Sequence, residues 1–253
     1  MKHLLLLILG FGLFITYANA DQITLISDDW CPINCVPESE NPGFMVDIAK
    51  TIFKKAGHTV IYKKVPWERA IQQTRKGKYS AVIGAFHGDA PDFIFPKNEQ
   101  GMIGNAFFTT KSSAWRYEGV SSLKNVKFGV IKGYDYSDEI NKYIKDNPDS
   151  SAVQLAFGAT PLELNIKKLM KGRIDVLLES AYVFNYKIAQ MGLKNKVQFA
   201  GILAAPEKAF IAFSPANKMS ETYSQILSTG MDSIRKSGEL KKILAKYGLQ
   251  DWQ

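Results

Sequence analysis

The sequence predicts an α/β protein made of two lobes with a cleft between them. Apolar runs typical of buried strands alternate with amphipathic helices, the pattern of a mostly parallel sheet covered by helices. One phrase also occurs twice: residues 74–83 (TRKGKYSAVI) and residues 168–177 (KLMKGRIDVL) each resemble the end of a basic helix, a glycine stop and a buried strand. Two lobes of similar design would produce this repeat, and a cleft between them would be the natural place for a ligand.

The first unit is expected to follow the order β-α-β-α-β. Residues 44–56 carry apolar side chains at helical spacing and end at Gly57, whereas residues 81–86 are apolar throughout, as in a strand buried on both faces. The expected elements are a strand at 22–27, a helix at 44–56, a strand at 59–63, a helix at 66–76 and a strand at 81–86. Residues 87–110 look rich in loops, and residues 111–117 are expected to carry an extended chain out of this unit.

The second unit begins after this segment and repeats the alternation. Thr160, Pro161 and Glu163 form the pattern of a capping box with Pro in the first turn, which predicts a helix start. The expected elements are strands at 126–131, 153–157, 174–178, 197–200 and 210–213, and helices at 137–145, 160–171, 181–191, 221–236 and 239–247.

The N-terminus has the pattern of an export signal. Lys2 and His3 precede an apolar run at residues 4–17, and Ala18-Asn19-Ala20 supplies the small residues that a signal peptidase requires. The run is short for a membrane span, which needs about 20 residues. We therefore expect residues 1–20 to be a signal peptide cleaved after Ala20; an anchor that is retained is the alternative.

The charge of the chain does not indicate nucleic-acid binding. The sequence has 32 Lys and Arg against 24 Asp and Glu, a formal net charge of +8. Its lysines are spread over many predicted helix faces and form no tract, so we expect a solvated basic surface and no nucleic-acid partner.

The only two cysteines, Cys31 and Cys35, stand four residues apart with Pro and Asn between them. An exported protein meets an oxidising compartment, so we expect a disulfide that closes a tight local loop. A metal site is the alternative, but no nearby His or further Cys completes it, and no metal is predicted.

Patterns of enzyme chemistry are scarce in this chain. The sequence contains no Gly-x-Ser-x-Gly elbow, no His-Glu-x-x-His motif and no phosphate-binding glycine loop. Beyond the signal only His58 and His87 remain as histidines. We therefore expect neither an enzyme nor a cofactor.

Five segments, in order, carry a resemblance to a known family. They are Gly43-Phe44-Met45-Val46-Asp47-Ile48 before an amphipathic helix, Pro66-Trp67-Glu68-Arg69-Ala70, Gly172-Arg173-Ile174-Asp175, Ser237-Gly238-Glu239-Leu240 with Ile243, and Tyr247-Gly248. The chain resembles the family 3 extracellular solute-binding proteins, the amino-acid-type periplasmic receptors of ABC importers. This resemblance implies a type II periplasmic-binding fold.

The resemblance also implies how the lobes are divided. Lobe 1 would comprise 21–112 plus 213–253, and lobe 2 would comprise 116–208, with hinge crossings at 113–115 and 209–212. Closure would be a hinge motion around a ligand held in the cleft.

The function that the resemblance implies is capture of a small polar, amino-acid-like ligand in the periplasm and its delivery to an inner-membrane ABC permease. The protein would act as a monomer without a cofactor. Two alternatives share the scaffold: a dehydratase-like enzyme that uses His87, Asp89 and Glu179 as an acid–base set, and a receptor that feeds a membrane sensor.

One segment departs from the family pattern. Amino-acid binders of this family carry an Arg after the third strand that clamps the ligand α-carboxylate, but residues 85–96 read AFHGDAPDFIFP and contain no Arg. His and Asp cannot replace the two-pronged hydrogen bonding of a guanidinium. An ordinary α-amino acid held in the usual way is therefore not expected.

The ligand-binding candidates follow from where strands end and helices begin, because such clefts hold ligands there. The first strand brings Asp28, Asp29 and Trp30 to this edge. The selected candidates are Trp30, Trp67, Arg69, Phe86, His87, Asp89, Trp115, Arg116, Tyr134, Tyr136 and Glu179.

The strongest candidates are assigned roles, and each has a structural alternative. We expect Arg116, on the crossing segment, to anchor an anionic group and Glu179 to pair with an ammonium group. Trp30 would give an aromatic platform or pack on the cysteine loop. Asp89 would contact a cationic ligand or cap a turn. Arg69 would bind the ligand or form a surface ion pair.

Overall fold

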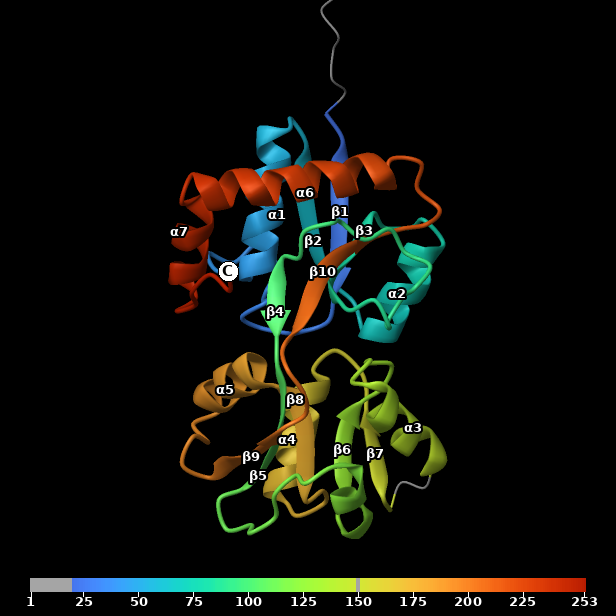
Figure 1. Ribbon diagram of the computed structural model, residues 1–253, viewed down its shortest axis with the longest axis vertical. Coiled ribbons are helices and arrows are strands. Elements are labelled where there is room, and N and C mark those ends of the chain that lie inside the picture. The colour runs from blue at the N-terminus through green and yellow to red at the C-terminus, as the bar shows by residue number, and fades with distance from the viewer. Residues whose placement is uncertain (1–19, 149–150) are drawn as a thin grey trace, which may run out of the picture.

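The computed structural model describes residues 20–148 and 151–253, and it has two lobes, one above the other in Figure 1. Each lobe is built on a five-stranded mixed sheet with helices on both sides. This architecture confirms the predicted α/β fold class. The predicted signal peptide, except Ala20, lies outside the described residues. In the part of the chain that is described, no helix is both long and apolar enough to span a membrane.

Lobe 1 contains the sheet with the strand order β2-β1-β3-β10-β4. Its strands are β1 (Gln22–Ser27), β2 (Thr59–Lys64), β3 (Ala81–Ala85), β4 (Gly101–Ile103) and β10 (Glu207–Phe213). Its helices are α1 (Phe44–Lys55), α2 (Trp67–Arg75), α6 (Ser220–Lys236) and α7 (Glu239–Lys246). β1 runs parallel to β2 and β3, whereas β10 runs antiparallel to β3 and β4.

Alternation of side chains along β1 and β3 builds two cores in lobe 1. Ile23 and Leu25 face the cluster that α1, α6 and α7 complete, while Ile26 and Val82 face the cluster under α2. All four side chains are fully buried. Because successive residues of a strand point to opposite faces, a continuous apolar run is what a strand covered on both faces requires.

Lobe 2 contains the sheet with the strand order β7-β6-β8-β5-β9. Its strands are β5 (Asn105–Thr110), β6 (Phe128–Ile131), β7 (Val153–Ala156), β8 (Val176–Ser180) and β9 (Val197–Ile202). Its helices are α3 (Asp138–Asp146), α4 (Pro161–Met170), α5 (Ala181–Gln190) and the 3-10 helix η1 (Val120–Asn125). β6 runs parallel to β7 and β8, and β5 runs antiparallel to β8 and β9.

The two sheets share one topology, which accounts for the phrase that occurs twice in the sequence. The first copy leads into β3, which lies between β1 and β10, and the second leads into β8, which lies between β6 and β5. In both copies a glycine with positive φ, Gly77 or Gly172, follows the helix. The repeated phrase therefore marks the same position in each lobe.

The chain crosses between the lobes at Gly104 and at residues 203–206. β4 belongs to the first sheet and β5 to the second, and the return from β9 to β10 follows the same junction (Figure 1). The crossings predicted at 113–115 and 209–212 thus lie elsewhere: the first crossing comes earlier in the chain, and residues 209–212 lie inside β10.

The first difference has a simple origin in the sequence. Residues 87–110 looked like a loop because Gly, Pro and Asn are frequent there, but their last part forms β4 and β5. Lobe 1 therefore ends near Ile103 instead of at 112, and residues 111–117 follow β5 within lobe 2 instead of carrying the chain between the lobes.

Two predicted helix starts differ in how they are capped. The Ser137 hydroxyl accepts a hydrogen bond from the backbone N–H of Ile140, so it caps α3. The predicted capping box at α4 does not form, because Thr160 makes no side-chain cap and Glu163 instead pairs with Lys167 one turn later. Pro161 begins α4, and its fixed φ suits the first turn of a helix.

Candidate functional site

The candidate site is a small, partly open cavity between the lobes, where the carboxyl ends of several strands meet. Its volume is about 20 Å³, room for roughly one water molecule. Lobe 1 supplies the last residues of β1 and β3, the residues that follow them and the start of α2, and lobe 2 supplies the turn after β6. The lining residues are Ser27, Asp28, Trp30, Trp67, Ile83, Gly84, Phe86, Asp89, Tyr134 and Asp135.

Two aromatic side chains donate hydrogen bonds to carboxylates of the opposite lobe. The Trp30 indole donates to Glu179 Oε1 at 2.8 Å, and the Tyr134 hydroxyl donates to Asp28 Oδ2 at 2.9 Å. Trp30 and Asp28 follow β1 in lobe 1, whereas Glu179 ends β8 and Tyr134 follows β6 in lobe 2. The structure is therefore that of closed lobes.

Two further hydrogen bonds join the lobes through the backbone of the turn after β6. The Trp67 indole donates to the carbonyl oxygen of Gly133 at 3.1 Å, and the N–H of Asp135 donates to Asp89 Oδ1 at 3.1 Å. The second oxygen of Asp89 accepts the N–H of Phe86 at 2.7 Å. Both oxygens of Asp89 are thus bound by backbone donors.

Aromatic rings form the walls of the cavity. Trp30 packs edge-to-face against Phe86 and Tyr134, with ring centroids 6.3 and 6.2 Å apart, and Trp67 packs against Tyr134 in the same way at 6.0 Å. Edge-to-face pairs of this kind stabilise a fixed orientation of each ring. The walls are therefore held in place by each other across the lobes.

Gly84 is the residue on which the Trp30 ring rests. It has φ of +83°, and a Cβ atom at this position would lie 2.8 Å from two carbon atoms of the indole. Only glycine adopts this conformation at no steric cost, and only glycine leaves room for the ring. Gly84 thus allows Trp30 to lie flat against the end of β3.

Three buried carboxyl groups surround the cavity, and each has a raised pKa. Burial raises the pKa of Asp28 to about 7, with a smaller contribution from the charge of Asp29. Burial likewise raises the pKa of Asp89 and of Glu179 to about 7. Hydrogen bonds from Tyr134 and Trp30 lower the values but do not cancel the loss of hydration.

Glu179 also carries an unpaired oxygen atom. The residue is 1% exposed, and its Oε2 atom has no hydrogen-bond partner among the described residues. The other oxygen, Oε1, accepts from the Trp30 indole and from the N–H of Ser180. Burying a carboxylate oxygen without a hydrogen-bond donor costs free energy, so a ligand that donates to this atom would be stabilised.

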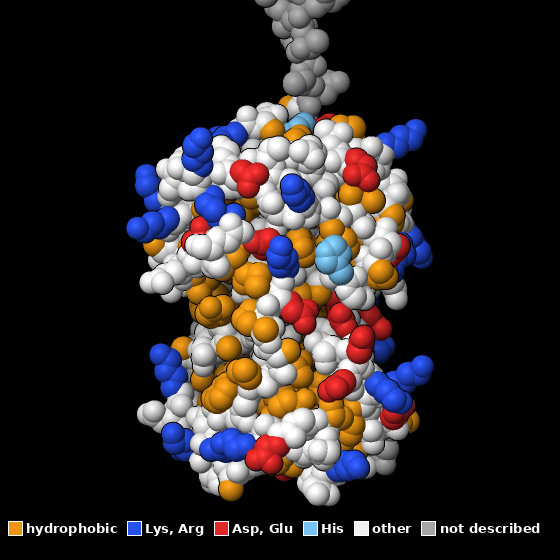
Figure 2. Space-filling view, viewed as in Figure 1, with side chains coloured by type: hydrophobic (Ala, Val, Ile, Leu, Met, Phe, Trp, Pro, Cys, Tyr) orange, Lys and Arg blue, Asp and Glu red, His pale blue; other side chains and the backbone are white. Residues whose placement is uncertain are grey.

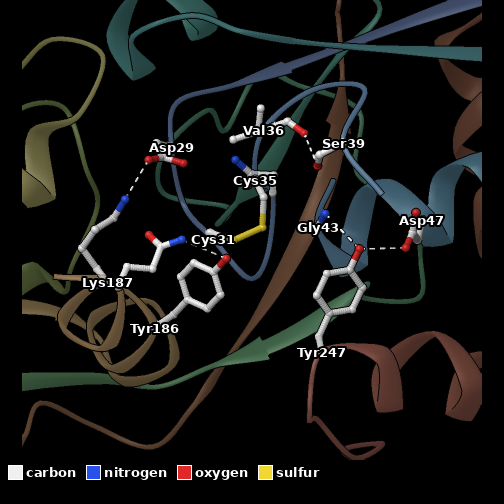
Figure 3. The surroundings of a disulfide bond; sticks show 12 residues. Asp29, Cys31, Cys35, Val36, Ser39, Gly43, Asp47, Tyr186, Lys187 and Tyr247 are labelled. Atoms are coloured by element: carbon white, nitrogen blue, oxygen red, sulfur yellow. Dashed lines mark hydrogen bonds and ion pairs between the residues drawn. A yellow bond between two sulfur atoms is a disulfide. The ribbon is translucent and has the colours of Figure 1, made fainter. Parts of the chain in front are cut away.

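Lysine side chains pair with the neighbouring carboxylate of Asp29 but not with the carboxyl groups of Asp28, Asp89 or Glu179. Lys187 of α5 reaches across the junction to Asp29 at 3.0 Å, beside the disulfide loop (Figure 3), and Lys64 lies 3.3 Å from the same carboxylate. Among the described residues, no ion pair includes Asp28, Asp89 or Glu179. The cavity therefore has an excess of acidic groups.

The surface around the junction shows a similar distribution. On the face drawn in Figure 2, hydrophobic side chains extend along the junction of the lobes, and Asp and Glu side chains gather beside them. The hydrophobic part includes a groove lined by Phe44, Met102, Tyr182, Phe199, Ile202 and Trp252, among others.

The predicted disulfide between Cys31 and Cys35 is confirmed, with Cα atoms 4.5 Å apart. Within its loop the N–H of Trp30 donates to the carbonyl of Asn34 at 3.1 Å, and the Asn34 amide donates to the carbonyl of Asp28 at 2.7 Å. The disulfide loop thus fixes the backbone around Asp28 and Trp30, whose side chains reach the cavity.

The end of lobe 1 supports the same loop from outside. Figure 3 shows the Tyr247 hydroxyl between the N–H of Gly43, from which it accepts at 3.0 Å, and Asp47, to which it donates at 2.7 Å. The C-terminal helix α7 is thereby tied to the start of α1.

The structure brings together about half of the candidates predicted from the sequence. Trp30, Trp67, Phe86, Asp89 and Tyr134 line the cavity. Glu179 adjoins it through its hydrogen bond to Trp30. Tyr136 is buried in lobe 2, where its hydroxyl accepts the N–H of Ile131, and its ring contacts that of Tyr134.

The other four candidates lie away from the cavity. Trp115 and Arg116 follow β5 in lobe 2: Trp115 packs on Phe107, and the exposed Arg116 guanidinium donates to the carbonyls of residues 113 and 115. His87 is exposed and stacks on Phe95. Arg69, exposed on α2, does not line the cavity but lines an adjoining pocket that shares Asp28 and Trp67 with it.

Sequence reasoning did not select several residues that the structure places at the cavity. Asp28 was placed at the correct edge, because it follows β1, but was not chosen. Ser27, Ile83 and Gly84 are ordinary strand residues in the sequence, so no local signal distinguishes them. Asp135 lies between two tyrosines that were chosen, and its position in the same turn could have indicated it.

No metal centre is present in residues 20–148 and 151–253, because no three His, Cys, Asp or Glu side chains there are arranged to hold a metal ion. The arrangement instead suits binding: donors and acceptors from two lobes converge on a small, partly open space, with aromatic walls.

Comparisons with known proteins agree with this description. Residues 23–89 match the family model described as bacterial extracellular solute-binding proteins, family 3. A probable histidine-binding protein of Neisseria gonorrhoeae is 24% identical over 242 residues, which cover 91% of this chain and 84% of that protein.

Solved structures with the same fold cover both lobes. A histidine kinase sensor domain with similarity to periplasmic binding proteins has a TM-score of 0.73 at 20% identity, covering 91% of this chain and 98% of that one. An ancestral arginine-binding protein bound to arginine has a TM-score of 0.71 at 22% identity, covering 89% and 97%.

These findings confirm the fold, and residues 23–89 match the family that the sequence resembles. The type II periplasmic-binding fold is shared along nearly the whole described chain. The matched family model describes solute-binding proteins. Residues 23–89 thus match bacterial extracellular solute-binding proteins of family 3, and nearly the whole described chain shares the fold of solved amino-acid-binding proteins.

Proposed function

We propose that this protein is a periplasmic receptor that captures a small polar solute by hinge closure and delivers it, as a monomer, to an inner-membrane ABC permease. The observation that carries this proposal is the meeting of strand ends from both lobes around one small cavity, with hydrogen bonds across the junction. A solute held between the lobes would lose most of its contact with water, which is how such sites gain affinity.

The two crossings are suited to a hinge. Gly104 alone separates β4 from β5, and residues 203–206 separate β9 from β10. Only these two short segments join the lobes covalently. A change of backbone angles in a few residues of this kind is sufficient to rotate one lobe relative to the other.

Relatives support a small nitrogen-containing solute. The Neisseria gonorrhoeae relative is described as a probable histidine-binding protein, and neighbouring structures contain bound arginine or glutamine. These proteins share at most 24% of their residues with this chain over the aligned region. They suggest the class of function, whereas the choice of ligand depends on the residues of the cavity.

A second candidate function is supported by one neighbour. Because a histidine kinase sensor domain shares the fold along 91% of the chain, a receptor that reports to a membrane kinase is the alternative to transport. The two are separated by reconstitution: a transport receptor stimulates the ATPase activity of its importer in liposomes, whereas a sensory receptor changes the autophosphorylation of its kinase.

The first test of a solute receptor is a ligand screen. Thermal unfolding of the mature protein is measured with amino acids, amines, short peptides and organic acids, and any compound that raises the midpoint is then tested for chemical conversion. Binding without conversion supports a receptor, since a ligand that binds only the folded state must stabilise it. Conversion of the bound compound would contradict it.

Closure itself can be tested at Gly88. A Cβ atom there would lie 1.8 Å from Asp135 Oδ2 of the opposite lobe, and all of its nearest neighbours belong to Asp135. Gly88 does not have positive φ, so alanine is tolerated by the backbone. Gly88→Ala is therefore expected to hinder closure at a cost of roughly 1–3 kcal/mol and to weaken ligand binding about tenfold or more, as measured by calorimetry.

The control for this variant removes the obstacle. Gly88→Ala combined with Asp135→Ala is expected to regain most of the lost affinity relative to Asp135→Ala alone. Equal affinities of Gly88→Ala and the unmodified protein would show that the lobes do not close on the ligand as described.

A further inference from the structure

The charge of the cavity lining is one-sided. Among the described residues that line it, none is Lys, Arg or His, whereas Asp28, Asp89 and Asp135 all carry carboxyl groups, and Glu179 adds a fourth beside Trp30. The two nearby lysines both pair with Asp29. A ligand enclosed here would meet negative charge from the lining, while Arg69 and Lys132 line an adjoining pocket that shares Asp28 and Trp67.

A second observation is independent of the number of acidic groups. Glu179 Oε2 is buried and has no donor among the described residues. Glu179 and Asp28 are close enough for their charges to influence each other, and Trp30 and Tyr134 stand between the lobes beside them. A positively charged group that donates hydrogen bonds could pair with the carboxylates of Glu179 and Asp28 together.

The walls favour an organic cation over a metal ion. Trp30, Trp67, Phe86 and Tyr134 surround the space with ring faces and edges, and aromatic faces attract ammonium groups. A metal ion would instead need several oxygen ligands in a defined geometry, and the described residues contain no such group of side chains.

A carboxylate on the ligand would find no partner here. The backbone donors at the junction, the N–H groups of Phe86 and Asp135, are already occupied by the carboxylate of Asp89. The segment that follows β3 has no Arg, and Arg116 lies in lobe 2 away from the cavity. The Asp89 carboxylate thus already accepts the backbone hydrogen bonds that an acidic group of a ligand would need.

On the basis of the proposed receptor function, we infer that the cleft selects a compact organic cation, an amine or quaternary ammonium compound without a carboxylate, whose charged nitrogen lies between Glu179 and Asp28 against the aromatic walls. The closed cavity is small, so Trp30 and Tyr134 must move away from their carboxylate partners as the cation takes their place. A compact ligand requires the smallest displacement.

Matched pairs of compounds test this inference. Agmatine and arginine, histamine and histidine, and putrescine and ornithine differ within each pair only by the carboxylate. Calorimetric titration of the mature protein with all six, and with choline, is expected to show saturable binding of at least one cation without a carboxylate. Within each pair, an amine that binds should bind at least about tenfold more tightly than the corresponding amino acid.

Two results would overturn the inference, and they are distinguishable. If an amino acid binds more tightly than its amine, or if only an organic acid binds, the ligand class is wrong while the receptor function stands. If no compound of the six, of choline or of the wider screen binds, both the inference and the receptor function fail.

Discussion

Replacing Glu179 with Gln, or Asp28 with Asn, is expected to weaken the binding of an organic cation about 100-fold. Each replacement keeps the size of the side chain and an oxygen that accepts from Trp30 or Tyr134, but it removes the negative charge. Loss of one charge from a buried, hydrogen-bonded pair costs roughly 2–5 kcal/mol, and each 1.4 kcal/mol is about a factor of ten in affinity.

The matched control is an acidic residue on the surface of lobe 2. Glu163→Gln removes the same charge from an exposed pair with Lys167 on α4, and it should change the affinity less than about fivefold. Calorimetry of the three variants with the best cation measures the difference. Affinities of Glu179→Gln and Asp28→Asn within threefold of the unmodified protein would show that these carboxylates do not hold the ligand.

The second large effect is a dependence of closure on pH. Without ligand, the protein is expected to be closed at about pH 5 and to open by about pH 8. Burial between the lobes raises the pKa of Asp28 from 3.8 to about 7 in the closed structure. A shift of this size corresponds to roughly 4 kcal/mol in the equilibrium between closed and open lobes.

The direction follows from where the protons are bound. In the open form the carboxyl groups face water and keep ordinary values, so closure takes up protons. The stabilisation of the closed form is complete below about pH 4 and is lost as the pH rises through about 7, since ionised carboxylates must then be buried. Asp89 and Glu179 contribute in the same direction.

Neighbouring groups do not reverse this sign. Tyr134 and Trp30 donate hydrogen bonds that favour the ionised carboxylates, but burial is the larger influence at each site. The other charged groups at the junction largely pair among themselves. They are Asp29 with Lys64 and Lys187, and Glu68 with Lys132.

Small-angle X-ray scattering at the two pH values measures the opening as an increase in the radius of gyration, and circular dichroism checks that the protein stays folded. A bound cation should abolish the increase at about pH 8, because it replaces the protons. An unchanged radius of gyration between the two pH values, without ligand, would contradict the account of the buried carboxyl groups.

Much of the fold was predictable because its signals are local. The strand at 22–27 and the helices near 44–56 and 221–236 follow from apolar periodicity and glycine stops, and the structure places them within about one residue of the prediction. The crossings were not predictable in this way. β4 and β5 are short and are separated by Gly104 alone, so their period could not be distinguished from a loop.

The candidate site was predictable to the extent that it follows from topology. Phe86 directly follows β3, and Trp30 and Tyr134 lie three residues after β1 and β6. The carboxyl ends of these strands, in two sheets, face the junction of the lobes, and all three residues line the cavity. Arg116 was placed on the assumption that its segment crosses between the lobes, and an error in the crossing moved it out of reach.

What the sequence could not give is the pairing of side chains across the lobes. The hydrogen bonds from Trp30 to Glu179 and from Tyr134 to Asp28 join residues more than 100 positions apart in the chain. Neither the unpaired oxygen of Glu179 nor the occupation of backbone donors by Asp89 has a sequence signature. These features, which decide the charge of the ligand, emerge only from packing.

A crystal structure of the protein with its tightest-binding compound tests whether the two carboxylates hold a cation. The account predicts closed lobes with a positively charged nitrogen of the compound within hydrogen-bond distance of Glu179 or Asp28, inside the walls formed by Trp30, Trp67 and Tyr134. A compound bound outside this cavity, or one that presents an acidic group to these carboxylates, would contradict it.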